Sequence, residues 1–134
     1  MADGFSVDSG SLERLTADLG ALVAENVRPF RQAVEITARH VKDEWRDRLK
    51  GSEYVPGGPG TVTYDIAVTR DGIEAEIGPE LGRKQASIVG ILETGTPSNP
   101  SGRGFGVRAL ADNVEDFERG ISKAIDDTLN GKGL

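Results

Sequence analysis

An alternating segment, a tight turn and a second alternating segment constrain the fold of this chain most. The segment Thr61–Thr69 places apolar side chains at every second position, which predicts a strand with one buried face; these are Val62, Tyr64, Ile66 and Val68. Asp71-Gly72 follows, and this dipeptide is typical of hairpin turns because glycine tolerates a positive φ. Ile73–Ile77 is then the return strand, with Glu74 and Glu76 facing water. The chain must therefore build an antiparallel sheet around this hairpin.

Apolar residues recur at helical spacing on both sides of the hairpin. One series runs from Leu12 to Val27 and resumes from Phe30 to Leu49, with Pro29 between the two. Since proline interrupts the helical hydrogen-bond ladder, this pattern predicts a long N-terminal helix kinked near Pro29, or two helices. Glu13 would then lie in the first helical turn, where the helix dipole favours an acid. A further series from Val107 to Leu129 predicts a C-terminal amphipathic helix.

The remaining segments are shorter. Phe5–Asp8 alternates and predicts a short strand, and residues 86–92 are apolar without clear periodicity, which fits a strand or a short helix. Residues 55–60 and 94–106 are rich in glycine and proline and are predicted to be loops.

Helices toward the ends of the chain with strands between them indicate an α+β fold with a small antiparallel sheet. A length of 134 residues fits one domain over 1–134, and residues 1–10 and 130–134 are expected to be flexible. The edges of such a small sheet stay open unless another segment or another molecule pairs with them.

Composition excludes several classes of function. The net charge is −6, and residues 51–134 hold 13 acidic against 8 basic side chains, so affinity for the DNA backbone is not expected. There is no cysteine and no apolar run of the roughly 18 residues that a membrane span needs. The N-terminus has neither the basic start nor the apolar core of a signal peptide. We therefore expect a soluble intracellular protein.

No group of residues predicts an active site. His40 is the only histidine and lies within a helical segment, so a catalytic or metal-binding role is not favoured. Gly102–Gly106 superficially resembles a phosphate-binding loop but lacks the strand before it and a following Gly-Lys-Ser/Thr. Glu74, Glu76 and Glu80 cluster, yet alternation on an exposed strand accounts for the first two. The sequence predicts no enzyme, no cofactor and no metal.

Trp45 is the one large aromatic residue on the apolar stripe of residues 30–49, and it fits either the core or an interface. The basic residues of the same segment are interspersed with acids, which favours ion pairs within the helix over phosphate binding.

One segment resembles a signature of a known family. It is Ile91-Leu92-Glu93-Thr94-Gly95-Thr96, and it precedes a loop with an anchoring Phe105 and a helix that begins near Ala109-Leu110. Before it, the second hairpin strand ends in Ile77-Gly78-Pro79. This order and spacing resemble those of the neck, or tail-completion, proteins of long-tailed phages, among them the lambda-like Z-type minor tail proteins. The resemblance covers roughly residues 30–129.

The resemblance implies a virion protein, assembled in the host cytoplasm, that forms a ring between the DNA-filled head and the tail. Its partners would be copies of itself and neighbouring neck and tail proteins, with DNA passing through without specific binding. The candidate interface residues are Trp45, Ile91, Leu92, Glu93, Thr94, Gly95, Thr96 and Phe105, and the candidate channel-facing residues are Asp65, Glu74 and Glu76. Within the motif, Gly95 is expected to need a backbone conformation that a β-carbon resists, and Glu93 to cap nearby amides or to meet a basic residue of the next subunit.

The chain departs from the family at residues 59–62, 85–88 and 104–107, so a tail terminator or a head-closure component fits the same features. A small non-enzymatic cytosolic domain that binds proteins as a dimer is the alternative from another class, and a small hydrolase lacks a nucleophile with its base.

Overall fold

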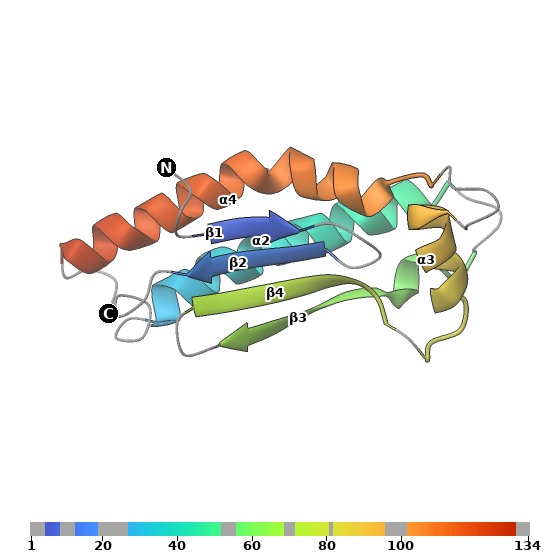
Figure 1. Ribbon diagram of the computed structural model, residues 1–134, viewed down its shortest axis with the longest axis horizontal. Helices are drawn as coiled ribbons and strands as arrows, with labels where there is room; N and C mark the ends of the chain where they lie inside the picture. The colour runs from blue at the N-terminus through green and yellow to red at the C-terminus, as the bar shows by residue number, and fades with distance from the viewer. Residues whose placement is uncertain are drawn as a thin grey trace.

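Two long helices pack on a four-stranded antiparallel sheet (Figure 1). The computed structural model describes residues 5–8, 13–18, 27–51, 56–68, 72–80, 82–95 and 102–130. The strands are β1 (Phe5–Asp8), β2 (Glu13–Asp18), β3 (Val62–Val68) and β4 (Gly72–Pro79), in the order β1-β2-β4-β3 across the sheet. The helices are α2 (Val27–Leu49), the short 3-10 turn η1 (Pro59–Thr61), α3 (Ala86–Thr94) and α4 (Phe105–Leu129). The predicted α+β class is confirmed.

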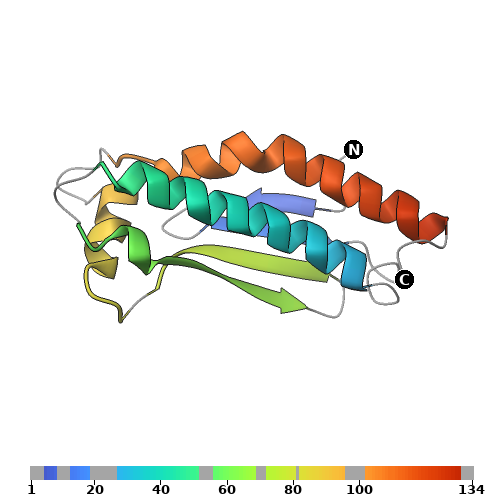
Figure 2. The ribbon, with the colours of Figure 1, turned by 180° about the vertical axis from the view of Figure 1, so that it is seen from behind.

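The molecule has two layers. Viewed from one side, the four strands lie in front of α2; viewed from the other side, α2 lies in front of the sheet and α4 runs alongside α2 on the β1 side (Figures 1 and 2). The shorter α3 lies at one end, beside the C-terminal end of α2 and the start of α4. No described helix lies on the other face of the sheet.

The predicted hairpin is confirmed by the register of β3 and β4. Ile73, Ala75 and Ile77 of β4 are buried beneath the helices, and the alternate residues Glu74 and Glu76 are half-buried on the opposite face. Cross-strand pairing sets Ile77 opposite Tyr64 and Ala75 opposite Ile66, so the apolar residues of both strands share one face.

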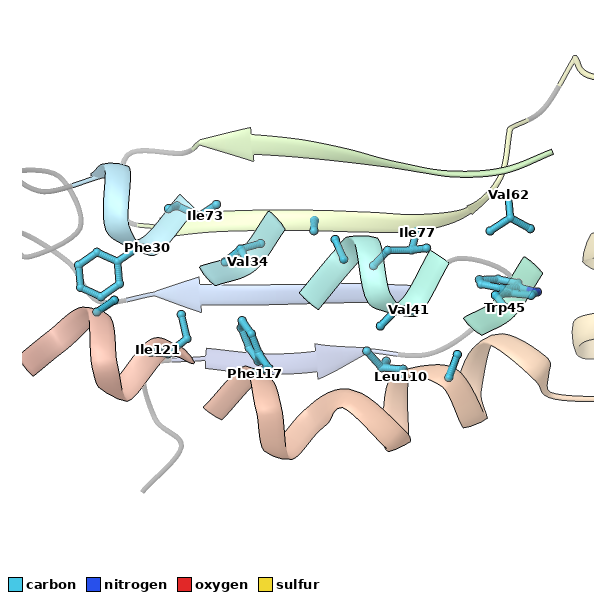
Figure 3. Packing of buried hydrophobic residues seen from close by; sticks show 14 of the residues in the cluster. Phe30, Val34, Val41, Trp45, Val62, Ile73, Ile77, Leu110, Phe117 and Ile121 are labelled. Atoms are coloured by element: carbon cyan, nitrogen blue, oxygen red, sulfur yellow. The ribbon is translucent and has the colours of Figure 1, made fainter. Parts of the chain in front are cut away.

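The core lies between this face and the two helices (Figure 3). The stripe of α2 predicted from periodicity is fully buried, and its members are Phe30, Val34, Ala38, Val41, Trp45 and Leu49. From α4, Leu110, Phe117 and Ile121 enter the same cluster. Arg48 links α2 to α4 at the surface. It forms salt bridges with Glu44 of α2 at 3.1 Å and with Asp112 of α4 at 3.0 Å.

The predicted helix over residues 12–27 is wrong in its first part. Residues Glu13–Asp18 form β2, which pairs antiparallel with β4 on the side opposite β3. Glu13 is thus a buried strand residue opposite Ile77 rather than the acid of a first helical turn. A segment this short satisfies helical spacing by chance, and pairing with a free strand edge decides its structure.

The predicted kink at Pro29 is also corrected. Pro29 is the third residue of α2, which begins at Val27. The amides of the first helical turn have no partner within the helix, so a proline there removes no hydrogen bond. Pro29 therefore lies at the start of a helix rather than within one.

Several shorter predictions are resolved in the described residues. Phe5–Asp8 is a strand, as its alternation predicts. The ambiguous segment 86–92 belongs to α3. The predicted loop 94–106 is too long at its C-terminal end, because α4 begins at Phe105. The turn residues 69–71, the loop residues 96–101 and the end 131–134 lie outside the described residues.

Candidate interaction surfaces

Glu93 joins two helices at one end of the molecule. Its side chain leaves the last turn of α3, is 4% exposed, and accepts hydrogen bonds from the backbone amides of Gly106 at 2.7 Å and Val107 at 3.1 Å. Both amides belong to the first turn of α4, where no acceptor within the helix exists. The residue that precedes α4 is Gly104, which has no side chain to cap the helix. Glu93 therefore supplies from α3 the cap that α4 lacks locally, which agrees with the first of the two roles expected for it.

Backbone contacts close the same region. The amides of Arg103 and Gly104 donate to the carbonyls of Leu92 and Glu93, at 2.6 and 3.2 Å. A β-carbon on Gly102 would lie 2.3 Å from the carbonyl oxygen of Glu93, so only glycine permits this approach. We call Leu92–Gly95 together with Gly102–Val107 the Glu93 junction. It fixes the end of α3 against the start of α4.

Gly95 ends α3 with φ +81° and ψ −168°, a conformation open essentially to glycine alone. The expectation that a β-carbon is resisted at Gly95 is confirmed. The loop Gly102–Gly106, considered above as a phosphate-binding loop, is part of the same junction. The amides at its helical end already bind the Glu93 carboxylate.

Burial raises the pKa of Glu93, and the hydrogen bonds from Gly106 and Val107 oppose this only in part. The nearby charge of Arg108 also lowers it. The carboxyl group thus binds a proton more readily in the folded protein than in water.

The outer side of α3 is apolar. Ala86, Val89 and Glu93 face the interior, whereas Ile88 and Ile91 are 42% and 49% exposed. These two isoleucines are three residues apart, so they are neighbours on one helix face. We call this pair the α3 ridge. Of the two, the sequence predicts only Ile91 as an interface residue, because residues 86–92 are apolar without a clear periodicity that would show which side chains face outward.

The other interface candidates have different positions. Trp45 is fully buried, and a β-carbon on Gly106 would lie 2.6 Å from its ring, so Trp45 is a core residue that holds the start of α4 and is not at the surface. Leu92 and Phe105 are half-buried and pack against the core. Thr94 is exposed at the end of α3. Thr96 lies outside the described residues.

The three channel-facing candidates share the face of the sheet that no described helix covers. Asp65 of β3 is directly opposite Glu76 of β4, and Glu74 lies two residues along the same strand. Arg14 of β2 pairs with Glu76 at 2.8 Å, a contact that the sequence did not predict because residues 13–18 were assigned to a helix. A shallow hollow of about 320 Å³ opens beside Asp65 and Glu76. We call Asp65, Glu74 and Glu76 the acidic face.

The remaining candidates are dispersed. His40 is exposed on α2, and Glu80 pairs with Arg83 rather than with the other two glutamates. Arg39 and Arg48 of α2, and Lys50 directly after it, pair with acids of α2 three or four residues away, as the sequence predicts. Among the described residues no group of three or more potential ligands could hold a metal ion. None of the described helices is both long and apolar enough to cross a membrane.

Comparisons with known proteins give no relative: no family model, no curated protein and no solved structure matches the chain.

Proposed function

We propose that this chain is a structural protein of the head-to-tail connection of a long-tailed phage. In this role it forms a ring in the neck that joins the portal side to the tail tube and surrounds the DNA channel. It acts by contact with copies of itself and with neighbouring neck and tail proteins.

The observation that carries this proposal is the division of the molecule into one covered and one uncovered sheet face. α2 buries the apolar residues of β4 on one side, and α4 packs on α2 and adds to the same core, which accounts for the stability of the fold. The acidic face and the α3 ridge are not needed for that core. Surfaces of this kind suit a subunit whose contacts are made on assembly. The order of the hairpin, the Glu93 segment and the last helix supports the same family.

The acidic face suits the wall of a DNA channel. DNA binds proteins mainly when lysine and arginine replace the counterions on its phosphates. A wall of carboxylates offers no such exchange, so DNA slides past it without being held. In the proposed ring, Asp65, Glu74 and Glu76 lie near the lumen.

Deletion of the coding sequence from a phage that carries it tests the proposal. We expect particles with DNA-filled heads and separate tails, and restoration of joined particles by the wild-type chain supplied from a plasmid. Mass spectrometry of purified joined particles should detect the chain. Joined, infectious particles in its absence would contradict the proposal and favour the alternative of a cytosolic binding domain.

A further inference from the structure

β3 forms one edge of the sheet, and no described helix or strand lies beyond it in the plane of the sheet (Figures 1 and 2). It has seven residues, against four in β1 at the other edge. Edge strands are commonly kept from pairing with other chains by shortness, by proline or by lysine. Val62–Val68 has neither proline nor lysine. The longer edge of this sheet is thus the less protected one.

The hydrogen bonds of the hairpin show which backbone groups of β3 turn outward. The amide of Glu80 donates to the carbonyl of Thr61, which lies directly opposite it, at 2.8 Å. In an antiparallel pair, opposite residues that exchange hydrogen bonds alternate with opposite residues that do not. The odd-numbered residues of β3 therefore bond to β4, and the even-numbered ones turn their amides and carbonyls outward. Pro79 agrees with this phase, because it lies opposite Val62, where no amide of β4 has to donate to β3.

Three of the outward residues have free backbone groups. The carbonyl of Val62 already accepts a hydrogen bond from Nε of Arg46 at 2.8 Å. The amides and carbonyls of Tyr64, Ile66 and Val68 make no hydrogen bond with any described residue. We call these three amides and three carbonyls the β3 edge. Such groups pair with a strand of another molecule when that strand presents donors and acceptors in the same alternation.

The β3 edge of a second copy presents this alternation. When two β3 strands run antiparallel with Ile66 opposite Ile66, Tyr64 of each copy lies opposite Val68 of the other. Each amide of the β3 edge then donates to a carbonyl of the other copy, and the occupied carbonyl of Val62 is not required. β1 has only four residues, and alternate ones turn outward, so a contact between β3 and β1 of another copy would satisfy fewer groups.

The side chains favour the same register. On the helix side of the sheet, Tyr64 and Ile66 are half-buried and Val68 is 49% exposed, so the pairing brings apolar residues of the two copies together. On the uncovered face, Asp65 lies opposite Ala67 of the second copy, and both positions are exposed. A register with Asp65 opposite Asp65 would set two carboxylates directly against each other, which is destabilising.

We infer that two copies of the free chain join at the β3 edge, antiparallel and with Ile66 on the two-fold axis. Their two four-stranded sheets then form one continuous sheet. The inference goes beyond the proposed function and does not rest on it. A two-fold contact cannot repeat around a ring whose copies all point the same way, so within the proposed function the dimer precedes the ring.

Disulfide formation between single-cysteine variants reads the register, because the chain has no cysteine of its own. The variants are Asp65→Cys and Ala67→Cys in β3, with Glu115→Cys at an exposed position of α4 as the control. Opposite residues that exchange no hydrogen bonds have Cα atoms about 4.5 Å apart, which suits a disulfide. Each variant is oxidised alone and mixed with each other variant, and one member of every mixture carries a mass label.

We expect the mixture of Asp65→Cys and Ala67→Cys to give the mixed disulfide in about tenfold higher yield than any mixture that contains Glu115→Cys, since pairing raises the effective concentration of the second thiol. The yield should rise as salt is added. The pairing brings the acidic faces of the two copies side by side, and salt screens their repulsion. Light scattering of the wild-type chain at the same salt should give the mass of two chains.

A proline on the two-fold axis gives an independent test. Ile66→Pro removes an outward amide and no hydrogen bond to β4, and proline is tolerated where the amide of an edge strand faces outward. This variant should be monomeric by light scattering, with the circular dichroism of the wild type. Ile66→Val keeps the amide and is the matched control, which should remain a dimer.

A yield from the Asp65→Cys and Ala67→Cys mixture no higher than that with Glu115→Cys would overturn the inference. A dominant disulfide from Asp65→Cys alone, or from Ala67→Cys alone, would also overturn it, since a different residue would then lie on the axis. A wild-type chain that stays monomeric as its concentration and the salt are raised excludes the dimer. A folded Ile66→Pro variant that is still dimeric excludes the β3 edge as the contact.

Discussion

The two faces of the sheet differ in what covers them, and successive residues of β4 lie on opposite faces. Ile73, Ala75 and Ile77 of β4 are buried beneath α2, whereas the intervening Glu74 and Glu76 lie on the uncovered face. The same contrast holds for α3, in which Val89 and Glu93 face inward and Ile91 faces outward. The inward residues specify the fold, and the outward residues are left to determine what the chain binds. Substitutions on the two sides should therefore have separable effects.

The largest effect is expected at Trp45, on the covered side. Trp45→Ala removes a fully buried ring that packs on Gly106 and should lower the free energy of unfolding by about 3–5 kcal/mol. Denaturant unfolding measures this. Ile91→Ala, an apolar truncation on the outer side of α3, is the matched control and should change stability by less than about 1 kcal/mol. Equal losses in the two variants would remove the distinction between the sides.

Gly95, which ends α3 at the Glu93 junction, is compared with Gly90 inside α3. Gly95→Ala places a β-carbon on a residue with φ +81° and should lower the free energy of unfolding by about 1–3 kcal/mol. Gly90→Ala, in the middle of α3 with open space around it, should instead raise it by up to about 1 kcal/mol, because alanine favours a helix. Thermal unfolding of both variants tests the opposite signs. A stabilised Gly95→Ala would show that the junction does not require this backbone geometry.

The hairpin, the core stripe of α2 and the last helix could be predicted from sequence because each is a long periodic pattern. Residues 13–18 could not, since their structure depends on pairing with β4, which lies more than fifty residues away along the chain. The contact of Arg14 with Glu76 could not be predicted for the same reason, because it exists only when β2 pairs with β4. The capping role of Glu93 was foreseen as one of two possibilities. Its partners at Gly106 and Val107 were not, because only the folded backbone brings α3 to the start of α4.

Glu93 should make the stability of the covered side depend on pH. Glu93→Gln weakens the cap of α4 and should cost about 1–2 kcal/mol. Because burial raises the pKa of Glu93, its contribution to stability is greatest at pH values below the ordinary glutamate range and declines as the pH rises through the folded-state pKa.

The difference in free energy of unfolding between wild type and Glu93→Gln should therefore be larger near pH 4 than at pH 7. Urea unfolding at a series of pH values measures it. A difference that grows with rising pH would contradict the direction of this pKa. Glu76→Gln is the control for the same substitution outside the Glu93 junction.

The smallest effect on stability is expected on the uncovered face. The triple variant Asp65→Asn/Glu74→Gln/Glu76→Gln should keep the fold, with a change in stability within about 1 kcal/mol, because the Arg14–Glu76 pair is exposed and contributes little. Its affinity for DNA should stay the same or rise, since repulsion of phosphates is removed. Fluorescence anisotropy with labelled duplex DNA measures the affinity. A fall in affinity would contradict a channel-facing position.

Cryo-electron microscopy of the neck of a phage that carries this chain tests the central claim most directly. The account predicts several copies in a closed ring between head and tail, with the sheet face of Asp65, Glu74 and Glu76 toward the DNA and the outer side of α3 against the adjacent copy. A neck built entirely from other chains, or a ring whose lumen is lined by the outer surfaces of α2 and α4, would contradict it.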